Sequence, residues 1–356
     1  MKTAIVTWIT YRNFGTFLQA YALQQVIQGM GYEAWIIDDS RFLLKDKSSV
    51  RQFAYYIKQR ILKSILLGNT KYYDNFRRNF LRVDSVHSSF QQLNNQYDTF
   101  ICGSDQIWSA HAKKISPYFY LAFVASGKRC ISYAPSTGTN EFSEAYCKTV
   151  KPWIERLDAI SVRERSCAEM LRAFIEREVK VVLDPTLLLS KEQWLNLVTP
   201  VDDSDYILCY FLTPNRWYMD YAQTYAKKVG KRLLIFATND SYRNYGDRML
   251  AAGPQEFVSY IYYADRVFTD SFHGSIFSLL FEKEFVTFKR FEDNHPQNQN
   301  ARVKDLFNML GILSRFIDQT QLDCIECLPP LSFESINEKL NQKKRYSLDF
   351  LRTNLY

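Results

Sequence analysis

Long apolar runs are missing from this sequence of 356 residues, of which 47% are hydrophobic and 23% charged. No stretch approaches the roughly 20 apolar residues that a transmembrane helix needs. Residues 1–6 run directly into a predicted strand, without the longer apolar stretch and small-residue cleavage site of a secretory signal peptide. We therefore expect a folded protein of the cytoplasm.

Several motifs of common enzymes are also missing. The sequence contains no Walker loop, no G-x-G-x-x-G fingerprint and no nucleophile elbow. These absences argue against an NTPase, a nicotinamide-dependent dehydrogenase and a serine hydrolase. Histidine occurs only four times, and no cluster of residues forms a complete set of metal ligands, so we expect neither a metal nor a cofactor.

The seven cysteines are scattered mainly through apolar surroundings, which indicates free thiols in a reducing compartment. Cys324 and Cys327 have the spacing of a redox or zinc pair. No second pair and no nearby histidine completes a zinc set, so we assign this pair no function.

The net charge of +7 comes from one interval, because residues 51–82 hold eight basic residues and one acid. A generally cationic surface for nucleic acid is therefore not expected. The interval belongs to a helical insertion at about residues 45–95, where Lys58, Arg60 and Lys63 alternate with apolar residues. It predicts either a contact with the anionic inner face of a membrane or a solvated amphipathic helix packed on the first domain.

Strands and helices alternate twice along the chain, on either side of a polar linker at residues 199–205. This pattern predicts an α/β fold in which two Rossmann-like domains, residues 1–198 and 205–330, face a cleft. A C-terminal helix within residues 331–356 is free to cross back to the first domain. The predicted strands are residues 4–8, 34–38, 99–102, 130–134, 159–162, 181–183, 206–212, 232–237, 266–269 and 285–288.

Ligands of parallel sheets bind beyond the carboxyl ends of the strands, so the segments that follow the predicted strands form the candidate site. These segments are small, polar or charged, and we expect them to converge on one crevice. Gly103 and Ser104 present backbone N–H groups that suit phosphate or carboxylate oxygens, although Gly-Ser also serves as a plain tight turn. The candidate substrate-binding residues are Asn13, Gly15, Thr16, Gly103, Ser104 and Ser136.

Three further residues carry side-chain chemistry. Arg163 directly ends a predicted strand and can clamp an anion through a bidentate fork. Asp105 can accept a proton from a hydroxyl, or cap the helix expected after it. His273 lies between an apolar strand and an apolar helix, where it can donate a proton, hold a phosphate oxygen or be a hydrogen-bonded structural residue.

Taken together and in this order, the motifs resemble those of the polysaccharide pyruvyl transferase family over nearly the whole chain. Each motif alone is modest, and their order makes the set specific. The motifs are NFGTFLQAYAL (13–23), CGSDQIW (102–108), YAPS (133–136), SVRE (161–164), DPT (184–186), TDSFHGS (269–275) and NAR (300–302).

The resemblance implies a fold like the two-domain glycosyltransferase class called GT-B, with the first domain on the acceptor side and the second on the donor side. It also implies transfer of a pyruvyl group from phosphoenolpyruvate to two hydroxyls of a sugar, which forms a cyclic ketal and releases phosphate. The acceptor would be a cell-surface polysaccharide, such as an exopolysaccharide or capsule, or its lipid-linked precursor. Two other functions stay open, a sugar-nucleotide glycosyltransferase of similar architecture and a noncatalytic glycan-binding relative.

The family's His-Gly segment corresponds to His273 and Gly274, and its strand-end arginine corresponds to Arg163. We interpret His273 as the general acid and Asp105 as the base. The donor-binding residues are then Arg163, Ser271, Gly274, Ser275 and Arg302.

Ser271 is a departure from the family, because many relatives carry an arginine two residues before that histidine. The anion contact of that arginine must come from another group in this chain. The candidates are Arg302, Lys289 and Arg290.

Overall fold

The computed structural model of the chain describes residues 1–38, 68–85, 89–110, 115–139, 141–293, 295 and 298–355. Much of the predicted basic insertion, including Lys58, Arg60 and Lys63, lies outside these described residues. Within the described part, no helix has both the length and the apolar character needed to cross a membrane.

Parallel strands form the sheet of the N-terminal domain, in the order β3-β2-β1-β4-β5-β6-β7. Strand β4 is buried along its whole length and β1 after its first residue, as their continuous apolar sequences predict. The strands are β1 (Lys2–Val6), β2 (Glu33–Ile37), β3 (Val83–Asp84), β4 (Thr99–Cys102), β5 (Arg129–Ser132), β6 (Ala159–Val162) and β7 (Lys180–Val181). The helices are α1 (Phe14–Gly29), α4 (Thr70–Phe80), α5 (Glu144–Glu155), α6 (Arg165–Arg172) and α7 (Lys191–Leu195).

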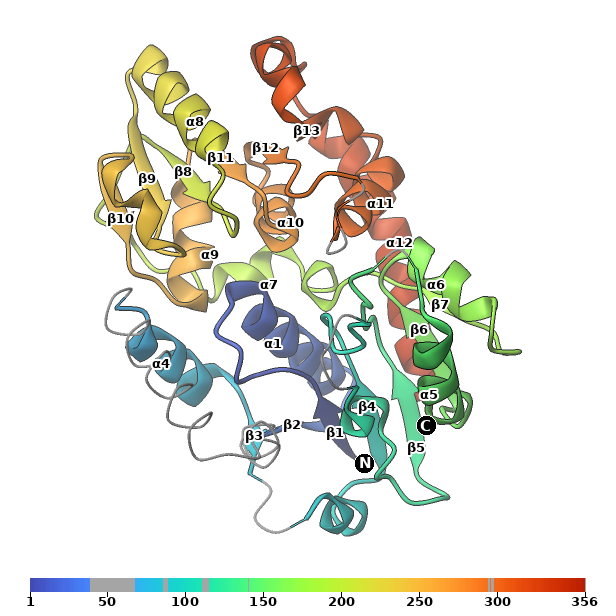
Figure 1. The fold of residues 1–356 in the computed structure, drawn as a ribbon. Helices are drawn as coiled ribbons and strands as arrows, with labels where there is room; N and C mark the ends of the chain where they lie inside the picture. The colour runs from blue at the N-terminus through green and yellow to red at the C-terminus, as the bar shows by residue number, and fades with distance from the viewer. Residues whose placement is uncertain are drawn as a thin grey trace, which may run out of the picture.

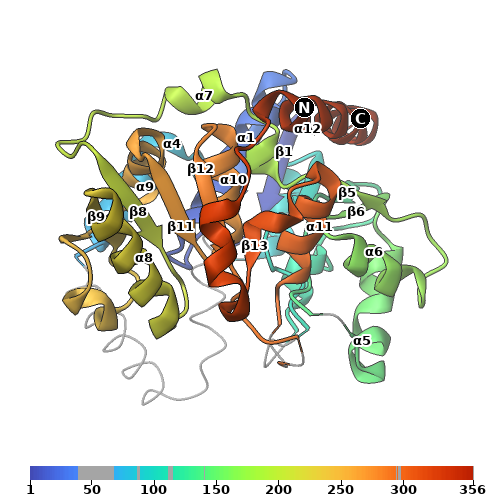
Figure 2. The same ribbon diagram turned by 90° about the horizontal axis from the view of Figure 1, so that it is seen from above.

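A second parallel sheet forms the core of the C-terminal domain, in the order β10-β9-β8-β11-β12-β13. Helix α8 covers one of its faces, and α9 and α10 cover the other (Figure 2). The strands are β8 (Tyr206–Tyr210), β9 (Arg232–Phe236), β10 (Arg248–Leu250), β11 (Arg266–Thr269), β12 (Glu284–Phe288) and β13 (Phe316–Ile317). The helices are α8 (Arg216–Val229), α9 (Pro254–Tyr263), α10 (Phe272–Leu280), α11 (Ala301–Leu310) and α12 (Phe333–Asn354).

Each sheet reverses its strand order at one place, between β1 and β4 in the first and between β8 and β11 in the second. Switch points of this kind open a crevice at the carboxyl ends of the strands. Helix α1 follows β1 and is capped by Asn13, whose side chain accepts the N–H of Thr16. Helix α10 follows β11 and is capped by Ser271, which accepts the N–H of Gly274. The start of each helix therefore lies at the crevice of its own domain.

The two domains share an apolar core, because α1 of the first packs against α9 and α10 of the second (Figure 1). The ring of Phe14 stacks on Phe257 of α9 with a centroid distance of 4.8 Å. It also meets Tyr210 and Phe236, each at 5.2 Å. Aromatic pairs at these distances add to the stability that burial alone provides, so the domains face each other across a packed contact.

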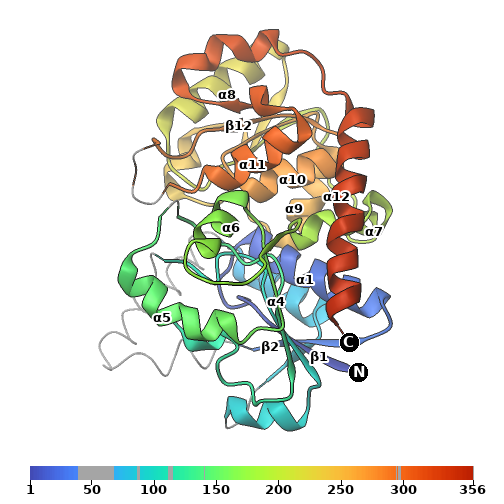
Figure 3. The ribbon, with the colours of Figure 1, turned by 90° about the vertical axis from the view of Figure 1, so that its right-hand side faces the viewer.

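Helix α12 crosses back along the N-terminal domain (Figure 3). The Oγ of Ser347 accepts the N–H of Leu183 at 3.0 Å, and the carbonyl of Asn354 accepts Nε of Arg129 at 3.0 Å. The sequence left this crossing open, and the structure shows it.

Candidate active site

A cavity of about 510 Å³ lies between the two domains, beyond the carboxyl ends of β1, β4, β8 and β11. The first domain contributes the loop after β1 and the first turn of α1. The second contributes the start of α10 and the segment that leads into α11. A cavity of this size holds a small ligand. Of the candidate site residues, it is lined by Asn13, Thr16, Asp105, Ser271, His273 and Arg302.

Asp105 lies at the wall of this cavity, with its carboxylate held by two donors. The hydroxyl of Thr16 donates to Oδ2 at 2.6 Å, and the N–H of Gln106 donates to Oδ1 at 2.9 Å. The alternative that Asp105 caps a helix is wrong, because a turn follows it in place of a helix. The carboxylate is therefore fixed at the cavity, in a position that suits a base.

His273 occupies the first turn of α10 and reaches across to the first domain. Its ring lies against Gly15 of α1, where a Cβ atom would come within 1.9 Å of Nδ1. Its Nε2 lies 3.6 Å from Oδ2 of Asp184, too far for a hydrogen bond but close enough for an ion pair when the ring is protonated. Gly15 is not one of the described residues that line the cavity. Its lack of a side chain leaves room for this ring.

Asp184 is the centre of a buried polar cluster, and it is not among the site residues predicted from the sequence. Its carboxylate accepts Nη1 of Arg163 at 2.8 Å, Oγ1 of Thr186 at 2.6 Å and Oγ of Ser104 at 3.3 Å. Burial opposes its ionisation, yet His273, Arg163 and Thr186 hold the pKa of Asp184 well below its usual range. The sequence did carry one signal for Asp184, because this residue directly follows the predicted strand at residues 181–183.

Arg163 is turned toward the protein instead of the cavity. Its Nε donates to Glu164 at 2.9 Å and its Nη1 to Asp184 at 2.8 Å, so two protein carboxylates occupy its fork. Burial disfavours the charge, but these carboxylates and Asp105 still raise the pKa of Arg163. The guanidinium lies over the ring of Phe272 at 4.6 Å, and Arg163 is not among the described residues that line the cavity. Arg163 therefore does not form the bidentate clamp on a ligand that the sequence predicted.

Arg302 is one of the arginines that line the cavity. Its Nη2 donates to Gln299 at 3.0 Å, and its guanidinium lies 5.7 Å from the centre of the Phe272 ring. Among the described residues it has no carboxylate partner within ion-pair distance. Burial, together with the charges of Arg163 and Arg290, lowers the pKa of Arg302 to about 10. An anion beside it would relieve this repulsion.

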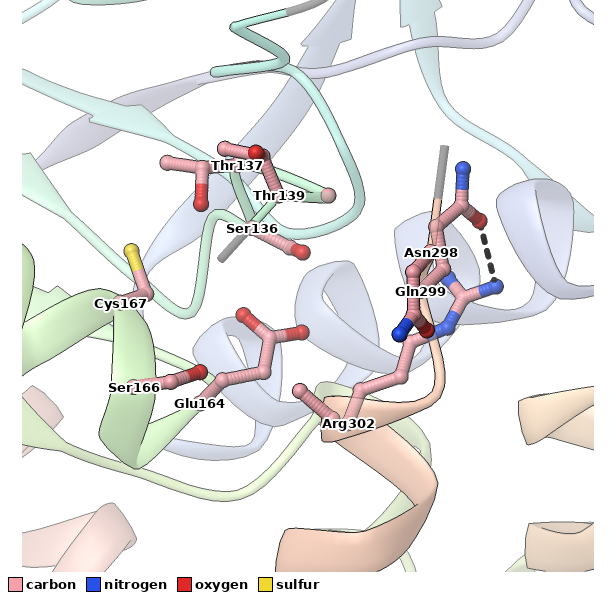
Figure 4. Close-up of a pocket in the computed structure, with 11 residues that line it drawn as sticks. Ser136, Thr137, Thr139, Glu164, Ser166, Cys167, Asn298, Gln299 and Arg302 are labelled. Carbon is pink, nitrogen blue, oxygen red and sulfur yellow. Dashed lines mark hydrogen bonds between the residues drawn. The ribbon is translucent and has the colours of Figure 1, made fainter. Parts of the chain in front are cut away.

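A second, smaller pocket adjoins Arg302, with a volume of about 10 Å³ that suits roughly one water molecule. Figure 4 shows Arg302 and Gln299 on one side of it, opposite Glu164 and Ser136. The N–H of Ser136 donates to the carbonyl of Asp105 at 2.8 Å, which ties this pocket to the wall of the main cavity.

Gly103 and Ser104 do not supply free N–H groups as the sequence suggested. The N–H of Gly103 donates to the carbonyl of Val6 at 3.1 Å, and that of Ser104 donates to Oε1 of Gln19 at 3.0 Å. Gly103 has a φ of +129°, and a Cβ atom there would lie 1.9 Å from the carbonyl oxygen of Tyr133. These two residues build the turn that carries Asp105.

Gly274 and Ser275 also face the protein, and neither is among the described residues that line the cavity. A Cβ atom on Gly274 would lie 2.4 Å from Oγ1 of Thr269. The hydroxyl of Ser275 donates to the carbonyl of Ser271 at 3.0 Å and contacts Oγ1 of Thr287 at 2.7 Å. The expected donor contacts of these two residues are therefore replaced by contacts that seat α10 on the sheet.

The candidates for the missing family arginine are distinguished by their positions. Lys289 pairs with Asp293 at 3.1 Å and is not among the described residues that line the cavity. Arg290 lines it, but its Nε donates to Thr213 at 2.7 Å. Arg302 lines the cavity without a carboxylate partner in the described part of the chain, so it is the best placed of the candidates.

Unsatisfied polar groups gather at this site. Five buried side-chain atoms at the two pockets or the Asp184 cluster have no hydrogen-bond partner in the described residues. They are Nε2 of Gln106, Oγ1 of Thr137, Nη2 of Arg163, Nε2 of His273 and Nε of Arg302. Folded proteins leave few such groups unpaired, so their concentration here indicates a site for a polar ligand.

Known structures share this two-domain arrangement. An alpha-glucosyltransferase in complex with UDP and a 13-mer DNA matches with a TM-score of 0.52 and 12% identity, over 99% of this chain and 95% of that chain. A putative UDP-N-acetylglucosamine 2-epimerase from Listeria monocytogenes matches with a TM-score of 0.50 and 10% identity, over 99% and 91% of the two chains. At these identities the likeness shows the fold alone. The fold is of the GT-B class, and the predicted architecture is confirmed.

The family follows from the sequence itself. The model of the family described as polysaccharide pyruvyl transferase matches residues 13–290. The chain therefore belongs to the polysaccharide pyruvyl transferase family, and the resemblance of its motifs is confirmed. No curated protein matches the sequence.

Proposed function

We propose that this protein transfers a pyruvyl group from phosphoenolpyruvate to two hydroxyls of a sugar. The observation that carries the proposal is Arg302, a cation at the cavity without a carboxylate partner in the described residues. Phosphoenolpyruvate carries a phosphate and a carboxylate, and arginine is the residue best suited to both groups. Arg290, which lines the same cavity, adds a second positive charge.

The chemistry requires an acid and a base at the same cavity. One sugar oxygen attacks C2 of phosphoenolpyruvate while the methylene carbon C3 takes a proton from His273. Asp105 accepts the proton of that hydroxyl. The second hydroxyl then attacks C2 as phosphate leaves. Its proton passes to His273, and the proton held by Asp105 leaves with the phosphate, so both residues return to their starting protonation states. Asp184 supports this role, because a carboxylate facing Nε2 compensates the charge of a protonated ring.

The acceptor in this proposal is a cell-surface polysaccharide or its lipid-linked precursor. A lipid-linked acceptor would place the enzyme at the inner face of the membrane. The basic residues within 51–82 would then hold it there through the anionic lipid surface. Family membership supports the sugar acceptor, and the charge pattern of the sequence supports the membrane contact.

The direct test is incubation of the purified protein with phosphoenolpyruvate and a panel of glycosides and lipid-linked oligosaccharides. We expect phosphate release that depends on one acceptor, together with a product whose mass has increased by one pyruvyl ketal. A parallel incubation with UDP-sugars tests glycosyl transfer. If no acceptor in the panel supports phosphate release and the protein transfers sugar from a UDP-sugar, the proposal is contradicted in favour of a glycosyltransferase.

A further inference from the structure

Tyr11 is an exposed aromatic ring at the wall of the cavity. It is 63% exposed, the largest fraction among the exposed large hydrophobic side chains of the described residues. It also lines the 510 Å³ cavity, whereas the exposed rings of Tyr263 and Tyr346 are not among its lining residues. An aromatic ring left uncovered inside a ligand cavity is a candidate contact surface for an apolar face of the ligand.

The backbone that carries Tyr11 is held in place, although its ring is uncovered. The carbonyl of Tyr11 accepts the N–H of Asn13 at 2.9 Å, which closes the loop onto the cap of α1. The next residue, Arg12, donates to Oγ1 of Thr70 at 2.9 Å and so ties the loop to α4. A ring on a fixed loop loses little conformational freedom when a ligand covers it.

Trp8 adds a second ring to this wall of the cavity. Its centroid lies 6.3 Å from that of Tyr11 with an angle of 56° between the rings, and Trp8 also lines the cavity. The indole also makes an edge-to-face contact with Phe119 at a centroid distance of 6.0 Å. The two rings therefore form an angled aromatic wall, which we call the Trp8–Tyr11 platform.

The platform differs in charge from the other wall of the cavity. The single cation of its loop, Arg12, is paired with Asp74 at 3.4 Å. The second domain, by contrast, presents Arg302 and Arg290. A trianionic donor is attracted to the arginines, whereas an uncharged ligand with C–H-rich faces fits the platform.

We propose that the Trp8–Tyr11 platform is the acceptor subsite, where the Tyr11 ring packs against the C–H face of an uncharged pyranose. The negative face of an aromatic ring attracts polarised C–H groups, and the sugar hydroxyls stay free at the edge of the pyranose. Asp105, which is held by Thr16, lines the same cavity as Tyr11, so the stacked sugar and the proposed base share one cavity. The assignment of this ligand as an acceptor rests on the proposed function, whereas the binding of a sugar does not.

The test is a binding titration by saturation-transfer NMR with methyl glycosides of neutral hexoses and N-acetylhexosamines. Methyl glycosides are chosen because they carry no aromatic group of their own. We expect Tyr11→Ala to raise the Kd of the best-bound glycoside about tenfold, since aromatic contacts of this kind have that magnitude. Tyr11→Phe keeps the ring and is expected to bind like the wild type. Tyr263→Ala removes an exposed ring on α9 and serves as the matched control.

A parallel titration with phosphoenolpyruvate separates this proposal from the proposed function. We expect its Kd to stay the same in Tyr11→Ala. An unchanged glycoside Kd in Tyr11→Ala, or no glycoside bound by the wild type, would overturn the platform. Glycoside binding that depends on Tyr11, combined with no binding of phosphoenolpyruvate, would support the platform and contradict the proposed donor.

Discussion

Gly15 and His273 are in contact across the two domains, with the imidazole lying in the space that a side chain at residue 15 would fill. A Cβ atom on Gly15 would stand 1.9 Å from Nδ1 and 2.3 Å from Cγ of His273. The first turn of α1 therefore fixes the position of a ring that belongs to α10. This contact makes the placement of the expected general acid depend on a residue of the other domain.

Gly15→Ala is expected to displace the imidazole and to lower turnover with phosphoenolpyruvate by about 100-fold, the effect of a misplacement of roughly 1 Å. Phosphate release measures the loss, and circular dichroism checks that the fold is retained. Gly29→Ala is the control on the same helix, because nothing lies within 4 Å of a Cβ atom there. Alanine has a higher helix propensity than glycine, so this control variant should fold and be fully active. Wild-type turnover in Gly15→Ala would contradict the role of the contact.

His273→Asn is expected to lower turnover by about 100- to 10,000-fold, the usual contribution of a general acid. The affinity for phosphoenolpyruvate should change much less, since the arginines supply the charge contacts. Single-turnover kinetics separate the two effects. His295→Asn is the control, because His295 stacks on Phe291 and is not among the described residues that line the cavity. Full turnover in His273→Asn would rule out the acid assignment.

Ligands of parallel sheets bind beyond the carboxyl ends of the strands, and this rule predicted much of the site from the sequence. It placed Asp105 and His273 at one cavity because the carboxyl ends of parallel strands meet at one edge of a sheet, whereas Arg302 was chosen from the family resemblance. It did not predict which polar groups pair with one another. The N–H of Ser104, for example, is used by Gln19, which is 85 positions away in the sequence. Such pairings depend on how helices pack on the sheet, and sequence periodicity carries no information about them.

Arg163 shows the same limit. Its place at a strand end indicated an anion, and the anion turned out to be the carboxylate of Asp184 together with that of Glu164. A buried guanidinium needs such partners whether or not a ligand binds nearby. The sequence thus predicted the kind of interaction correctly and its partner incorrectly.

Asp184→Asn is expected to destabilise the fold by about 3 kcal/mol at pH 7, because it leaves Arg163 buried with one carboxylate fewer. The pKa of Asp184 is lowered in the folded state, so the carboxylate stabilises the fold above the unfolded value of about 4. This stabilisation is lost as the pH falls below that value. Urea unfolding between pH 7 and pH 3 should therefore show the difference between variant and wild type shrinking below about pH 4.

The control for this pH series is Asp349→Asn, which removes a carboxylate that is 67% exposed and paired with Arg352. An exposed pair of this kind contributes little to stability, so we expect unfolding like that of the wild type. A constant difference between Asp184→Asn and the wild type at all pH values would show that the charge of Asp184 is not the cause.

Replacement of Lys58, Arg60 and Lys63 by glutamine tests the proposed membrane contact. Each basic residue near an anionic surface contributes roughly 1 kcal/mol, so we expect partitioning onto phosphatidylserine vesicles to fall by about 100-fold. Vesicle sedimentation measures this, and phosphate release with a water-soluble acceptor should stay unchanged. Vesicle binding that persists in the triple variant would remove the contact from the proposal.

Arg302→Gln tests which group takes the place of the family arginine that is Ser271 here. We expect the Kd for phosphoenolpyruvate to rise about 10- to 100-fold, the range for a hydrogen bond to a charged group. Stability should not fall, since Arg302 is repelled by Arg163 and Arg290 and its pKa is lowered to about 10. Arg315→Gln is the contrasting control, because Arg315 is paired with Glu284 at 2.9 Å and its loss should destabilise the fold without changing the Kd.

The double variant Ser271→Arg, Arg302→Gln then asks whether the two positions are interchangeable. Ser271 lines the cavity, so an arginine there can reach a donor bound beside His273. The substitution also removes the cap of α10, which costs about 1 kcal/mol of stability. We expect a Kd for phosphoenolpyruvate below that of Arg302→Gln alone, together with a lower Tm. A Kd no better than that of the single variant would mean that Arg302 binds the donor at a place which position 271 cannot reach.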